Sequence, residues 1–86
     1  MVFLALSREA ALEAIALAKV GGHHVWVGAD ALTRDEHSAQ VKSGVKITRF
    51  SDPLGDGDTA IDEAVETIRE HHPSETLWIQ RKNHTR

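Results

Sequence analysis

The sequence predicts a small α/β domain built on a four-stranded, mostly parallel sheet with the order β-α-β-α-β-α-β. Short apolar segments typical of strands alternate with segments typical of helices, and glycine or proline ends each helical segment. Strands that alternate with helices pair in parallel through right-handed crossovers. The 86 residues suffice for one modest core, so we expect a single domain over residues 1–80 and a disordered tail over residues 81–86.

The first half of the chain contains two predicted strands around a helix. Residues 2–6 (VFLAL) and 24–29 (HVWVGA) are continuous apolar runs, as in strands that are buried on both faces. Between them, residues 10–20 are rich in alanine and leucine, with Ser7 placed to cap the helix and Gly21-Gly22 to end it. Such an apolar helix is predicted either to pack deeply or to form a subunit contact.

The second half repeats the alternation with more polar elements. A short helix follows Thr33, which together with Glu36 has the spacing of a capping box. Residues 45–50 and 76–80 alternate between apolar and polar faces, with Trp78 opposite to its two apolar neighbours. Between these strands, residues 58–72 carry an apolar stripe at helical spacing: Ile61, Ala64, Val65 and Ile68.

The apolarity of the strands indicates their order. The two continuous strands are expected at the centre and the two alternating strands at the edges, which favours 3-2-1-4, half of a Rossmann-like sheet, over the flavodoxin-like 2-1-3-4. Trp26 and Trp78 both lie within strands, so we expect them to be core or sheet-face residues.

Composition excludes several classes of function. The net charge of −3 and pI of about 6.0 oppose non-specific nucleic-acid binding, and the lack of cysteine excludes disulfides, thiolate metal sites and a cysteine nucleophile. No run is long enough to span a membrane, and no basic region precedes the apolar N-terminal run, so we expect a cytoplasmic protein. The first strand-to-helix turn has no glycine, which opposes a dinucleotide or ATP site.

The acidic segment before the last helix is the strongest candidate for a metal site. Residues 52–63 (DPLGDGDTAIDE) place acids at positions 1, 5, 7 and 12 of a calcium loop, with glycine at position 6; these acids are Asp52, Asp56, Asp58 and Glu63. Leu54 at position 3 breaks the pattern. The same residues fit a turn and a helix cap, which is the favoured interpretation, and the cation site is the alternative.

A magnesium-dependent reaction on phosphate is the second possibility at this end of the sheet. Asp30 follows the second strand and would meet Asp52 if the two strands are neighbours. Arg49 is the only plausible cation to neutralise a phosphoryl group there. We therefore predict no cofactor, and the alternative is a divalent cation held by Asp30 and the four acids of the loop.

Two histidine pairs are expected at the opposite end of the sheet. His23-His24 and His71-His72 each follow a helix and precede a strand, and in the favoured order the first strand separates them by about 10 Å. Zinc binding is one interpretation. Hydrogen bonding to the carbonyls at helix ends is the favoured one, with a mild pH response around pH 6–7.

The sequence shows no pairing of a nucleophile with a base, so an enzyme is the less favoured hypothesis. The outer face of the last helix carries acids that could attract a basic protein: Asp62, Glu63, Glu66 and Glu70. The favoured hypothesis is a non-enzymatic protein-interaction or regulatory module that binds a protein partner or a second copy of itself. The alternative is a metal-dependent phosphoryl-transfer or phosphate-binding domain.

Overall fold

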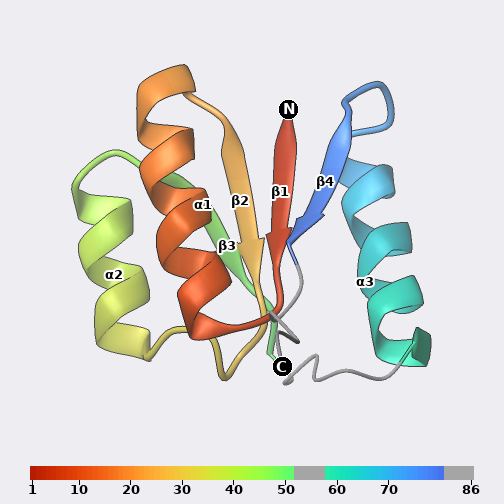
Figure 1. Ribbon diagram of the computed structural model, residues 1–86, viewed down its shortest axis with the longest axis horizontal. Coiled ribbons are helices and arrows are strands. Elements are labelled where there is room, and N and C mark those ends of the chain that lie inside the picture. The colour runs from red at the N-terminus through yellow and green to blue at the C-terminus, as the bar shows by residue number, and fades with distance from the viewer. Residues whose placement is uncertain (52–57, 81–86) are drawn as a thin grey trace, which may run out of the picture.

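The computed structural model describes residues 1–51 and 58–80, and it confirms the predicted α/β fold (Figure 1). The elements in chain order are β1 (Val2–Ala5), α1 (Arg8–Gly21), β2 (His24–Val27), α2 (Arg34–Lys42), β3 (Lys46–Arg49), α3 (Asp58–His71) and β4 (Leu77–Gln80). All three strand pairs are parallel, and the order β3-β2-β1-β4 is the predicted one.

The helices cover the two faces of the sheet unequally. Figure 1 shows α1 and α2 on one face, here called the α1 face, and α3 alone on the other, the α3 face. The alanine-rich side of α1 lies against β1 and β2, because small side chains let a helix approach a sheet closely. The α1-face core contains Phe3, Ala5, Ala10, Ala11, Ala14, Ile15, Ala18, Val25, Val27, Ala31, Leu32 and Ile47.

The α3 face holds the second half of the core. Its buried members are Val2, Leu4, Leu6, Trp26, Ile61, Ala64 and Ile68. Trp26 is 5% exposed, which confirms its predicted place in the core. Within the described residues, no helix combines the length and apolarity that crossing a membrane requires.

The predicted helix ends are confirmed in detail. Ser7 Oγ accepts from the N–H of Ala10 at 3.2 Å, and Gly22, at φ +69°, adopts the left-handed conformation that ends α1. At α2, the N–H of Glu36 donates to Thr33 Oγ1 at 3.1 Å, and Glu36 Oε1 accepts from the N–H of Thr33 at 2.9 Å. These two bonds form the predicted capping box.

α2 is held to the domain mainly by polar contacts, because none of its residues is buried. Glu36 pairs with Arg8 at the start of α1. The ring of His37 hydrogen-bonds through Nε2 to the carbonyl of Ile47 at 3.2 Å. These contacts fix α2 beside β3.

Among the described elements, no helix lies over the last strand on the α1 face. The main contacts of α1 are with β1 and β2 and those of α2 are with β3, and Figure 1 shows neither helix over β4. Trp78, which points to this face, is therefore 56% exposed. Trp78 lies on a sheet face, as predicted, but it does not lie in the core. The two helices on this face pack against the other three strands.

Candidate functional site

The predicted divalent-cation site lies mainly outside the described residues. Asp52 and Asp56 fall in the segment 52–57, and the side chain of Asp58 is not described either. Asp30 lies exposed in the turn after β2, and Glu63 lies exposed on α3. Over residues 1–51 and 58–80, no three histidine or acidic side chains come together to hold a metal. The cation site stays a prediction.

Arg49, the cation considered for phosphate binding, is engaged in the fold. Its Nε donates to the carbonyl of Leu32 at 3.1 Å, and a terminal nitrogen donates to the carbonyl of Ala29 at 2.7 Å. The guanidinium therefore ties the β2–α2 connection to the end of β3. It has fewer donors left with which to bind a phosphoryl group.

The acids proposed for protein binding all lie on the outer side of α3. Asp62, Glu63, Glu66 and Glu70 are exposed. They form an acidic surface on α3, the one helix that the described residues place on the α3 face (Figure 1). Its role in binding a partner stays a prediction.

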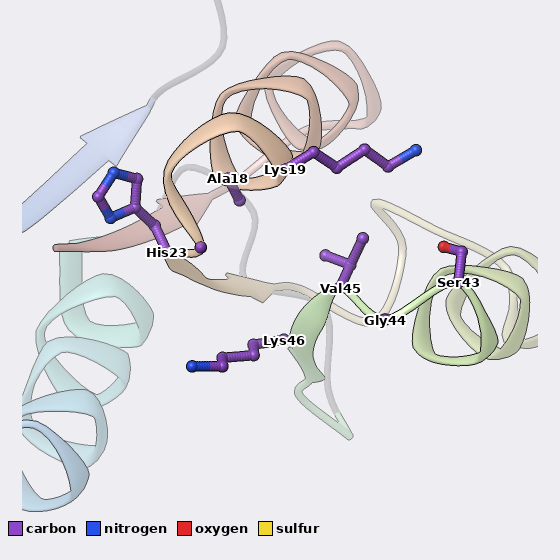
Figure 2. Close-up of a pocket in the computed structure, with 8 residues that line it drawn as sticks. Ala18, Lys19, His23, Ser43, Gly44, Val45 and Lys46 are labelled. Carbon is purple, nitrogen blue, oxygen red and sulfur yellow. The ribbon is translucent and has the colours of Figure 1, made fainter.

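A cavity of about 390 Å³ lies before the amino ends of β2 and β3. It is lined by Ala18, Lys19, Gly22, His23, Ser43, Gly44, Val45 and Lys46. Figure 2 shows that Lys19 and Lys46 extend in opposite directions and that His23 points away from Ser43. Polar groups that diverge in this way do not fix a small ligand, which needs a few convergent ones.

The histidine end of the domain differs from the prediction. The sequence predicts that the two histidine pairs are about 10 Å apart. The rings of His24 and His72 have centroids only 4.8 Å apart. The predicted separation is wrong for this pair because the end of α3 lies over β2. His71 lies there as well, with its ring 5.4 Å from that of Trp26. His23 instead contacts Phe3 on the α1 face, at 5.7 Å between ring centroids.

A chain of hydrogen bonds links this histidine cluster to the N-terminus. Trp26 Nε1 donates to His72 Nε2 at 3.4 Å, and His72 Nδ1 is 2.8 Å from Glu75 Oε2. Because an indole can only donate, neutral His72 must carry its proton on Nδ1 and donate it to Glu75. Glu75 Oε1 accepts from the amino group of Met1 at 2.9 Å. The chain fixes the α3–β4 connection against β1 and β2.

The electrostatics of the cluster favour the neutral form of His24 and the ionised form of Glu75. Burial lowers the pKa of His24, and repulsion from His72 lowers it further. Hydrogen bonds from the N-terminal amino group and from His72 lower the pKa of Glu75. His24 Nε2 also shares a hydrogen bond of 2.9 Å with Thr48 Oγ1 on β3. The cluster therefore links β2, β3 and the α3–β4 connection through hydrogen bonds of titratable groups.

An apolar surface lies beside β4, between this strand and α1. Trp78 is 56% exposed and Leu17 of α1 is 54% exposed. With Phe3 and Ile79 they surround a hollow of about 230 Å³. We call the four residues that line this hollow the β4 surface: Phe3, Leu17, Trp78 and Ile79.

Beside this surface, the backbone of β4 presents groups that have no strand partner within the described residues. The N–H of Val2 donates to the carbonyl of Thr76 at 2.9 Å, and Val2 is in register with Leu77. In a parallel pair, this arrangement directs the peptide groups of Trp78 toward β1 and those of Leu77 and Ile79 outward. No described strand lies beyond β4 to pair with them.

Sequence reasoning missed the β4 surface although signals for it were present. The alternation of residues 76–80 places Trp78 opposite to Leu77 and Ile79, and Leu17 is a large apolar residue outside the alanine-rich side of α1. Which face lacked a helix depended on the crossovers, and sequence reasoning stopped before placing them.

Comparison of the chain with models of protein families, with characterised proteins and with solved structures finds no match in any of the three. The functional argument therefore depends on the geometry of this chain alone.

Proposed function

We propose that this chain is a non-enzymatic protein-interaction module that binds a protein partner through the β4 surface and the edge of β4. The observation that carries the proposal is the position of Trp78, more than half exposed beside an unpaired strand edge. Tryptophan is enriched among the residues that dominate binding energy in interfaces. An open edge offers main-chain hydrogen bonds to an added strand.

The chemistry of the surface fits a protein better than a small molecule. The hollow of about 230 Å³ is below the roughly 300–1,000 Å³ of typical ligand pockets, but it can receive an apolar side chain. The four residues that line the hollow are all apolar. Depletion of charge is the composition that distinguishes the centre of an interface.

Affinity capture from the source cells tests the proposal with three variants. We expect wild type and Val41→Lys to capture one stoichiometric protein, and Trp78→Lys to lose it. Val41 is the matched control because it is 50% exposed and lies on α2, beside the opposite edge of the sheet. A retained fold is checked by circular dichroism.

A further variant distinguishes the role of the acidic surface of α3 from that of the β4 surface. Glu66→Lys/Glu70→Lys reverses charge on two exposed residues. Loss of the partner in this variant, with retention in Trp78→Lys, would transfer the contact to α3. A partner retained by every variant would count against an interaction role for either surface, and so would a wild type that captures no other protein and also stays monomeric.

A further inference from the structure

We propose that the occupant of the β4 surface is a second copy of this chain, bound through antiparallel pairing of the two β4 strands about a two-fold axis at Trp78. This inference rests on the proposed interaction function and specifies its partner. The two sheets would join into one continuous sheet built from the four strands of each copy.

The backbone supports a register centred on Trp78. The outward peptide groups belong to Leu77 and Ile79, two residues apart. Antiparallel pairing about Trp78 sets Leu77 opposite Ile79 of the partner subunit, and the two residues exchange both hydrogen bonds. The two-fold axis repeats this pair, so every outward group of the two residues finds a partner.

The side chains match in the same register. Trp78 meets its own copy at a non-hydrogen-bonded position, where opposite Cα atoms approach to about 4.5 Å and cross-strand side chains are closest. An aromatic pair at such a position is among the stabilising cross-strand pairs of sheets. On the α3 face, Leu77 lies against Ile79 of the partner subunit. Apolar residues therefore meet apolar residues on both faces.

The four residues of β4 carry no charge that would oppose a second copy. Residues Leu77–Gln80 contain no charged residue and no proline, so the strand meets its own copy without like-charge repulsion. Within these four residues, the strand also offers no charge with which to select a charged strand. Native edges usually carry lysine, proline or a bulge to prevent self-pairing, and β4 has neither of the two residue types.

The charges on β3, the other edge strand, disfavour growth beyond two copies. β3 (KITR) begins with an exposed lysine and ends with Arg49. Pairing of β3 with β4 of another copy would be head to tail and could grow into an open filament, and pairing of β3 with itself would bring basic residues together. The symmetric β4 pair closes at two copies.

The small contact implies a weak dimer. A four-residue strand and a few side chains lie at the low end of protein interfaces, below about 1,200 Å² in total. We therefore expect a dissociation constant on the order of 10–100 µM.

Sedimentation equilibrium of the full chain tests the dimer over a hundredfold concentration range, about 5–500 µM. The mass should rise from one chain of 9.5 kDa toward two chains for wild type and for Val41→Lys. Trp78→Lys places two like charges opposite each other and should raise the dissociation constant at least tenfold. Circular dichroism and thermal unfolding verify that each variant is folded.

Single cysteines test the register independently of Trp78→Lys. The chain has no cysteine, so Trp78→Cys provides one thiol per copy, opposite its own copy at a Cα distance that permits a disulfide. Under mild oxidation Trp78→Cys should form covalent dimers at least tenfold faster than Ile79→Cys, whose copies would be more than about 7 Å apart. Val41→Cys is the control for random collision.

Each other result overturns the inference. These results are a monomer at all concentrations, a dimer that Val41→Lys weakens as much as Trp78→Lys, growth beyond two copies, or faster crosslinking at position 79 than at 78. A monomeric chain that captures a different protein in a Trp78-dependent way would refute the second copy and leave the proposed function standing. A monomer without a Trp78-dependent partner would refute both.

Discussion

The two edges of the sheet have the same length and direction but opposite surfaces. At β3, the exposed Lys46 and the hydrogen-bonded Arg49 flank Ile47, which is 8% exposed and packs in the α1-face core. At β4, Trp78 is 56% exposed and Ile79 is 36% exposed. β3 is thus a charged edge that is hydrogen-bonded to the β2–α2 connection, whereas β4 is an apolar edge with exposed side chains.

The difference follows from how the crossovers distribute the helices. α2 lies beside β3 on the α1 face, whereas no described helix lies over β4 there (Figure 1). An apolar strand without a covering element leaves apolar area in water, at a cost of about 25 cal/mol for each Å². We infer that β3 contributes to the fold, whereas β4 also provides a contact.

The largest effect should come from shortening the buried isoleucine of β3. Ile47→Ala should lower the free energy of unfolding by about 2–4 kcal/mol, because it leaves a cavity in the core. Ile79→Ala should cost only about 1 kcal/mol in the monomer, since its side chain is already partly in water. Urea unfolding at a concentration below that of self-association measures both. Equal costs would remove the distinction between the edges.

The next effect concerns the fastening of β3 by Arg49. Arg49→Ala removes the donors to the carbonyls of Ala29 and Leu32 and should cost about 1–3 kcal/mol in urea unfolding. Arg49→Lys keeps one donor group, so its free energy of unfolding should lie between those of wild type and Arg49→Ala. Neither variant should alter the mass measured by sedimentation, and a change in that mass would show that β3 takes part in association.

The smallest effect is the pH response of the histidine cluster, which lies between the two edges. The pKa of His24 is below its usual value of 6.5, through burial first and then repulsion from His72, Lys46 and His71, partly offset by Glu75. The unfolded chain therefore takes up a proton more readily than the folded one below about pH 6.5. Folding stability should accordingly fall as the pH drops through this range.

A second acid step should follow from two glutamates. Hydrogen bonds lower the pKa of Glu75, and those from Arg8 and Thr33 lower that of Glu36 to about 2. Their contribution is present above the usual value of 4.5 and is lost as the pH falls below it. Urea midpoints at about pH 7.5, 5.5 and 3.5 resolve the two steps. His24→Asn should remove the first step and leave the second, and a first step that persists would assign it elsewhere.

The sequence determined most of the fold, because its signals are local. Ser7, Gly22 and the Thr33–Glu36 capping box act within one helical turn, and all three occur where the residue types predicted them. The strand order was predictable as well, since continuous apolarity marks strands that are covered on both faces. The acidic loop gave a chemical hypothesis, but its residues lie largely outside the described structure.

What only the tertiary structure decided are the relations between elements distant in the chain. His24 and His72 meet because the end of α3 crosses over β2, and Arg49 reaches two carbonyls of a connection that precedes it by many residues. The exposure of Trp78 has the same origin. Its residue type favours burial, but burial requires a covering element, and the crossovers placed none over that face of β4.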